Sequence, residues 1–132
     1  MADVQFRTYL PYHKVRVDTP IVVTADTPTY TQMAQLVITD NLPAGEYVVS
    51  ISWEWSMPDV NDSALFRVIS PILQDTIYRH EPNDANEKAF RTASIPLTYA
   101  GGPITFTTEA SKTTGAADLT IGLSSIEFER KA

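Results

Sequence analysis

Cysteine is absent from this 132-residue chain, and several other signals are missing with it. Without cysteine there is no disulfide framework, no thiolate metal site and no cysteine nucleophile. No stretch approaches the roughly 18 consecutive apolar residues that a membrane-spanning helix needs. The first residues show no basic segment followed by an apolar run, so the sequence predicts no secretory signal. We expect no association with a membrane.

Motifs of catalysis and cofactor binding are missing as well. The chain has neither a Gly-x-Ser-x-Gly nucleophile elbow nor a glycine-rich phosphate loop. Its two histidines, His13 and His80, are far apart, whereas histidine metal sites need several ligands at defined spacing. We interpret both as surface or loop residues. Asp59, Asn61 and Asp62 share one turn, but their spacing is unlike that of an EF-hand, and turns favour such residues. The sequence therefore predicts a protein that is not an enzyme and holds no metal or cofactor.

Acidic residues outnumber basic ones. Sixteen Asp and Glu against ten Lys and Arg give a formal net charge of −6, and the sequence pI is about 4.7. An acidic balance opposes binding to nucleic acid through phosphate contacts, so we expect no direct nucleic-acid partner. Ordinary solubility explains the excess of acid.

Residues 46–57 show an alternation of apolar and polar side chains. Successive side chains of a strand point to opposite faces, so the pattern predicts a long strand with one buried face. Both tryptophans of the chain lie on that face, where a tryptophan is more typical of a core than of a sugar-binding platform. The apolar parity consists of Tyr47, Val49, Ile51, Trp53, Trp55 and Met57.

Similar alternation recurs between turn-forming residues along the whole chain. The other predicted strands are 3–10, 21–24, 33–39, 63–69, 88–98, 104–110 and 119–130, and 76–79 is an optional short one. No segment has a sustained helical period. About eight strands with short turns predict an all-β, single-domain, eight-stranded antiparallel β-sandwich of the jelly-roll type, with an immunoglobulin-like sandwich as the alternative.

Several details of this sandwich can be predicted. The strands at 46–57 and 63–69 should form a hairpin across the turn between them. Pro96 indicates an edge strand or a bulge. The parity of apolar residues changes at Ser124–Ser125, which favours a β-bulge there, although both faces of that strand being partly buried would explain it too. The polar stretch 81–87 should be an exposed loop.

The first twenty residues differ from the rest, because basic residues prevail there and aromatic residues and prolines punctuate the stretch. One interpretation is a first strand followed by a loop. The other is an extended arm, residues 1–20, that lies on a partner or a neighbouring subunit, with the jelly-roll domain at 21–132. On the second interpretation the partner-binding residues are Phe6, Arg7, Tyr9, Tyr12, Lys14 and Arg16.

A family resemblance adds to these predictions. The stretch 42–47, the tryptophan-bearing strand, the segment 61–68, the acidic 81–84 and the closing strand 119–131 resemble small structural proteins of tailed bacteriophages. The similarity covers about residues 33–131 and includes no catalytic motif. It implies a single β jelly roll that is part of a virion, either a head decoration (cement) protein or a part of a tail fibre or spike.

The residues and the resemblance together predict a non-enzymatic capsid decoration protein that binds the outside of the head shell and stabilises it. Its partner would be the major capsid protein, it would form a dimer or trimer, and it would be made in the host cytoplasm and reside on the virion exterior. The alternative is a tail-fibre, spike or receptor-binding module that recognises a host surface glycan. That alternative expects exposed aromatic rings, with Tyr30, Tyr78 and Tyr99 as candidates and a shallow site near Tyr78 and His80.

Overall fold

The computed structural model describes residues 12–131 of the chain. These residues form nine strands and no helix, so no helix in the described range could cross a membrane. The strands are β1 (Tyr12–Val17), β2 (Ile21–Val23), β3 (Thr31–Leu42), β4 (Gly45–Ser56), β5 (Ala64–Ser70), β6 (Leu73–His80), β7 (Ala89–Tyr99), β8 (Gly102–Lys112) and β9 (Leu119–Arg130).

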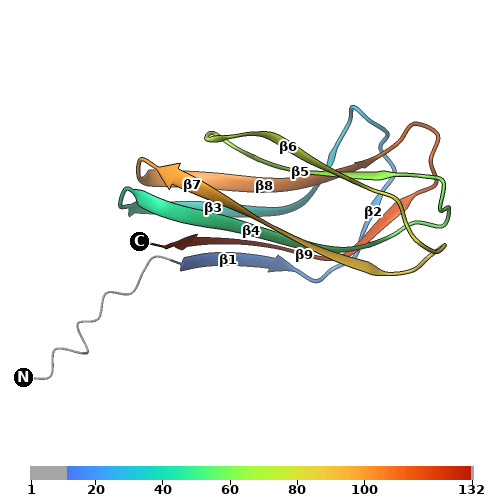
Figure 1. Ribbon diagram of the computed structural model, residues 1–132, viewed down its shortest axis with the longest axis horizontal. Coiled ribbons are helices and arrows are strands. Elements are labelled where there is room, and N and C mark those ends of the chain that lie inside the picture. Colours follow the sequence, from blue (N-terminus) through green and yellow to red (C-terminus); the bar gives the residue numbers. More distant parts are fainter. Residues whose placement is uncertain (1–11, 132) are drawn as a thin grey trace, which may run out of the picture.

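Two antiparallel sheets pack face to face (Figure 1). One has the order β1-β9-β4-β7, with β2 also paired to β9, and the other has the order β3-β8-β5-β6. This interleaving of strands from distant parts of the chain is the double Greek key of a jelly roll. The predicted all-β antiparallel jelly-roll sandwich is confirmed, with nine strands in place of eight.

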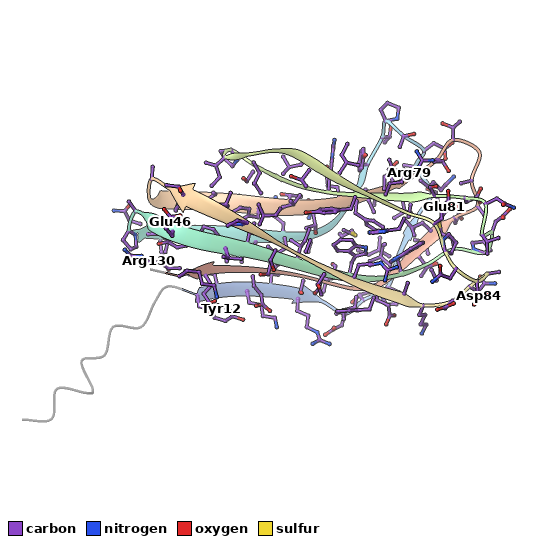
Figure 2. The ribbon with its side chains drawn as sticks, in the orientation of Figure 1. Tyr12, Glu46, Arg79, Glu81, Asp84 and Arg130 are labelled. Atoms are coloured by element: carbon purple, nitrogen blue, oxygen red, sulfur yellow. The ribbon has the colours of Figure 1, made fainter. Side chains whose placement is uncertain are left out.

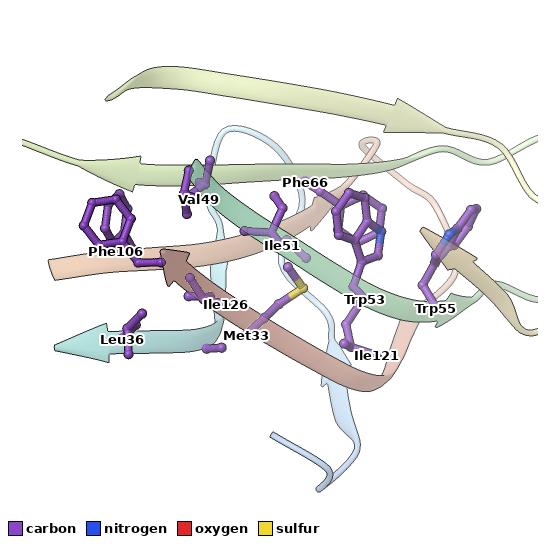
Figure 3. Close-up of a cluster of buried hydrophobic side chains, with 14 of the residues drawn as sticks. Met33, Leu36, Val49, Ile51, Trp53, Trp55, Phe66, Phe106, Ile121 and Ile126 are labelled. Atoms are coloured by element: carbon purple, nitrogen blue, oxygen red, sulfur yellow. The ribbon is translucent and has the colours of Figure 1, made fainter. Parts of the chain in front are cut away.

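The strand β4 lies at the centre of the core, as its alternation predicted. Its five apolar residues of the inner parity and Met57, which follows its last residue, are at most 2% exposed. They face the buried side chains of the opposite sheet, which Figure 3 shows for Phe66, Phe106, Leu36 and Met33. The ring of Trp53 packs against that of Phe66 at a centroid distance of 4.8 Å. The interpretation of both tryptophans as core residues is confirmed.

The predicted hairpin between residues 46–57 and 63–69 is wrong. β4 pairs with β7 and β9, whereas β5 belongs to the other sheet and pairs with β6 and β8. Residues 57–63 therefore cross from one sheet to the other. β4 and β5 each bury one whole face, and facing each other across the core buries the most apolar surface. Alternation shows which face of a strand is buried but not which strands lie in the same sheet.

The bulge in β9 lies two residues before the predicted position. Glu54 pairs with Leu123 and Trp55 with Ile121, so Gly122 is the extra residue. A Cβ on Gly122 would meet the end of the flexible Glu54 side chain, which would have to move aside. Beyond Gly122, Ser124 faces the core and is 1% exposed. A polar residue on the inner face therefore hid the true position of the parity change.

Two smaller predictions are confirmed. β7, which contains Pro96, is the edge strand of its sheet and pairs only with β4 in the described chain. The stretch 81–87 is an exposed loop in which Pro82 alone is buried. The strand predicted at residues 3–10 lies outside the described residues.

Trp53→Ala should lower the free energy of unfolding by about 3–5 kcal/mol, because it removes a large ring that is fully enclosed by core neighbours. Urea denaturation followed by circular dichroism measures this quantity. An unchanged unfolding midpoint would place the ring outside the core.

Candidate functional site

The described residues enclose no pocket, and no three of their His, Asp and Glu side chains come together as ligands for a metal ion. The distinguishing features of the described chain lie on its surface. They are the outer face of β1 and the two ends of the sandwich.

The predicted partner-binding residues divide into two groups. Phe6, Arg7 and Tyr9 lie outside the described residues. Tyr12, Lys14 and Arg16 lie on β1, opposite Glu129, Glu127 and Ser125 of β9, and are exposed on the outer face of the sheet. The structure thus brings these three together on one edge strand.

β1 occupies part of the stretch that was predicted as an arm. Residues 12–17 pair with β9 along their whole length and belong to the sandwich. Only Val15 and Val17 supply apolar side chains that pack against the core, so the alternation in this short strand was weak. For residues 1–11 the arm stays a prediction.

The basic side chains of β1 have acidic neighbours. Lys14 Nζ lies 3.3 Å from Glu127 Oε1, and Arg16 Nε lies 2.7 Å from Asp18 Oδ1. Such exposed pairs contribute below about 1 kcal/mol each. Their effect on recognition is larger, because they turn an apparently basic stretch into a surface of mixed charge.

The tyrosines proposed for a glycan site all contact other side chains or backbone of the protein; Tyr99 is buried, so its predicted exposure is wrong, whereas Tyr30 and Tyr78 are half-buried. Tyr99 is 5% exposed, and its hydroxyl donates to the backbone oxygens of Gly102 and Pro103. Tyr78 packs against Trp53 at a centroid distance of 5.8 Å, and burial raises its pKa. The ring of Tyr30 lies under the guanidinium of Arg67, 3.8 Å from its carbon.

One end of the sandwich, termed the acidic end, is rich in carboxylates. It is formed by the connections 57–63, 81–88 and 113–118. These contain Asp59, Asp62, Glu81, Asp84, Glu87 and Asp118, with Lys88 as the one basic residue. A hydrogen bond with Asp84 raises the pKa of the Glu87 carboxyl, which reflects this crowding. Figure 2 shows Glu81 and Asp84 at this end and Tyr12 at the other.

Specific bonds hold the loops of the acidic end. The buried Lys112 donates from Nζ to Asp26 Oδ1 at 2.5 Å and to the oxygen of Ala116 at 2.6 Å. The hydrogen bond from Lys112 lowers the pKa of the Asp26 carboxyl. Asp62 accepts the backbone N–H of Ala117 at 3.0 Å. The carboxylates of this end are therefore displayed on loops that are tied to the sandwich and to one another.

The opposite end, termed the turn end, has three short connections that contain no charged residue, and the charged Glu46 and Arg130 lie beside them (Figure 2). The connections are residues 43–44, 71–72 and 100–101, between β3 and β4, β5 and β6, and β7 and β8. The hydroxyl of Tyr47 donates to the oxygen of Pro43 at 2.7 Å, and Tyr99 secures the turn that follows β7. A Cβ on Gly101 would lie 2.7 Å from the backbone oxygen of Leu42, so the two turns are in backbone contact.

His80 faces inward, contrary to the interpretation as a surface residue. Its ring lies 6.0 Å from Trp53, 6.1 Å from Trp55 and 5.9 Å from Phe66, measured between centroids. Burial lowers the pKa of His80, and the charge of Arg91 lowers it further. To predict the inward direction of His80 from the sequence, the alternation that places Phe66 inside would have to be continued through the turn between β5 and β6. The other histidine, His13, lies 3.6 Å from Asp40.

Comparison with known proteins identifies a shared fold. No family model and no curated protein matches the chain. Among solved structures, a chain of the infectious bursal disease virus Gx strain matches with a TM-score of 0.50 at 10% identity, over 95% of this chain and 37% of that one. A sugar-binding protein, the EclA C-terminal domain, gives a TM-score of 0.46 at 15% identity, over 90% and 83% of the two chains. TmCBM61, solved in complex with β-1,4-galactotriose, gives 0.46 at 14% identity, over 99% and 97%. At these identities the likeness concerns the fold of the β-sandwich.

His80→Phe should make the stability less dependent on pH. The folded state favours the uncharged ring, whereas the unfolded chain takes up a proton near pH 6.5. The stabilisation by neutral His80 is therefore complete above about pH 6.5 and is lost as the pH falls through the lower folded-state pKa. Melting temperatures between pH 7.5 and 5 should fall less for His80→Phe than for the wild type. His13→Gln controls for the loss of a histidine, and equal slopes for His80→Phe and wild type would refute the effect.

Gly101→Ala should destabilise the protein more than Gly115→Ala. Both glycines have positive φ, 97° and 80°, but only at Gly101 does a backbone atom occupy the space of a Cβ. The backbone conformation alone should cost about 1–2 kcal/mol at Gly115. Chemical denaturation of both variants measures the difference, and equal losses would show that the contact between the two turns adds nothing.

Proposed function

We propose that this chain is a non-enzymatic virion structural protein, a decoration (cement) protein that binds the outside of a bacteriophage head shell and stabilises it. The observation that carries the proposal is a jelly roll whose loops at one end and turns at the other are fixed by specific hydrogen bonds. Such a body transmits force between the points at which it is held. The resemblance of residues 33–131 to small structural proteins of tailed phages supports the proposed location on a phage particle.

The proposed mechanism is mechanical. Copies dock on the major capsid protein, bridge neighbouring subunits and oppose their separation. Many copies on a repeating lattice act together, so that weak individual contacts suffice. A dimer or trimer on a symmetry axis presents the same patch to equivalent sites. The outer face of β1 with Tyr12, Lys14 and Arg16, together with Phe6, Arg7 and Tyr9, is the proposed contact.

The mixed charge of β1 refines this picture. Because Lys14 and Arg16 already have carboxylate neighbours, the docking surface need not be strongly acidic. Tyr12, which is 50% exposed, is the side chain of β1 with most apolar surface to bury.

The glycan-binding alternative is weakened, because Tyr99 is buried and Tyr30 and Tyr78 are only half-exposed. Tyr78, Tyr99 and His80 pack against their own protein, and Tyr30 lies under Arg67. Stacking on a sugar ring requires a free aromatic face. We therefore give decoration precedence over glycan recognition.

Binding to shells assembled from the major capsid protein of the same genome tests the proposal. Deleting residues 2–11 should reduce the number of copies that co-sediment with shells, because Phe6, Arg7 and Tyr9 are lost. A deletion through residue 18 would be misleading, since it removes β1 and a partner of β9. The wild type should also raise the temperature at which shells disassemble. Undiminished binding of the deletion variant would exclude residues 2–11 from the contact, and a wild type that ignores shells would refute decoration.

A further inference from the structure

We infer that two copies of this chain pair through β6 and form an antiparallel, twofold-symmetric dimer. The β3-β8-β5-β6 sheets of the two copies then join into one continuous sheet. The inference concerns contact between copies and stands independently of binding to a shell. It follows from the edge strands of the sandwich, from the side chains of β6 and from the distribution of charge.

The edge strands of the described sheets are protected to different degrees. An edge can pair with another molecule unless the strand is short, contains proline or is irregular. β1 and β2 are short, and β1 packs against β3 at one side of the sandwich, where His13 lies 3.6 Å from Asp40. The pairing of β3 is interrupted in two places, and β7 contains Pro96.

β6 has none of these forms of protection. It is eight residues long, contains no proline and pairs only with β5 in the described chain (Figure 1). Its pairing with β5 is regular from Thr76 to His80. The side of β6 that faces away from β5 has no neighbouring strand in the described structure, so it can accept one.

The position of Ile77 favours a second copy of the same strand. Ile77 lies near the middle of β6 and is 53% exposed on the outer face. Antiparallel pairing about a twofold axis at Ile77 aligns residues 74–80 of the two copies and sets the two isoleucines opposite each other. Directly opposite residues have Cβ atoms about 4.5–5.5 Å apart, so each isoleucine covers the other.

Half-buried apolar side chains line the same side of the molecule. Because β1 packs against β3, the strand order places β7 opposite β6 at the other side of the core. Leu73 and Tyr78 of β6 and Ile95 and Leu97 of β7 pack against the core but keep part of their surface exposed. A second copy at the β6 edge would remove some of this apolar surface from water, which favours association.

The distribution of charge favours the antiparallel direction. β6 runs from the turn end to the acidic end, so antiparallel partners place their acidic ends at opposite extremes of the dimer. Each chain has a formal net charge of −6, and this arrangement keeps the carboxylate-rich loops of the two copies apart. The same register sets each Arg79 opposite residue 75 of the other copy, so the two arginines do not oppose each other.

Two matched variants test this edge. Ile77→Lys sets two like charges opposite each other at the twofold axis, and Val37→Lys makes the same change in charge on β3, the other edge of the same sheet. Val37 is 57% exposed, so neither variant replaces a core residue. Sedimentation velocity from micromolar to submillimolar concentration measures association, and melting curves check folding. Wild type and Val37→Lys should form a species of twice the 14.6 kDa chain mass, whereas the Ile77→Lys dimer should be at least about tenfold weaker.

A cysteine at the same position gives a second measurement. The chain has no cysteine, so Ile77→Cys introduces its only thiol. Opposite Cα atoms of an antiparallel pair lie about 4.5–5.5 Å apart, which is within the span of a disulfide. With oxidised glutathione as the oxidant, Ile77→Cys should form a covalent dimer, whereas Val37→Cys at the same concentration should stay largely monomeric.

Three results would overturn the inference. The first is a wild type that stays monomeric up to submillimolar concentration. The second is an Ile77→Lys dimer as stable as that of the wild type, and the third is equal weakening by Val37→Lys, since both would place the contact elsewhere. None of these measurements involves shells, so their failure would leave the proposed function untouched.

Discussion

Burial of one face of β4 between the two sheets is the constraint on which the structure depends. This strand contributes two tryptophans, a tyrosine, a valine and an isoleucine to the core, all at most 2% exposed. Burying a large side chain is worth roughly 1.5–3 kcal/mol. Both sheets must therefore assemble around β4, and the jelly-roll connections bring β7 and β9 beside it and β5 and β8 across from it.

The two ends of the sandwich differ because of how a jelly roll is connected. All the longer connections after β2, β4, β6 and β8 fall at one end, and the short turns after β3, β5 and β7 fall at the other. Long connections have room for polar residues and can be bonded to one another, as Lys112, Asp26 and Asp62 show. Turns of two residues have little room for charge, and the turn after β7 contains Gly101 at positive φ. The different lengths of the two sets of connections are thus a consequence of the topology.

The positions of the strands could be predicted from the sequence better than which strands pair with each other. Alternation located the buried face of β4 and, within a few residues, most of the other strands, because burial of one face imposes a period of two. It did not reveal that β4 and β5 lie in different sheets, since a turn at Pro58–Asp62 suits a hairpin and a crossing alike. The bulge in β9 was predicted at the wrong position because the polar Ser124 lies on the inner face. The aromatic candidates failed for a related reason, because an isolated tyrosine such as Tyr99 does not show from its neighbours which way it points.

The position of Pro96 in the outermost strand affects how copies of the protein behave when crowded. Edge strands present unpaired backbone groups that can pair with another molecule, and proline removes one of the donors. At the opposite edge of the other sheet, the pairing of β3 is irregular in two places. Sheets interrupted in this way do not extend readily from one molecule to the next. Molecules at high concentration should thus be less prone to fuse into fibres through these two edges.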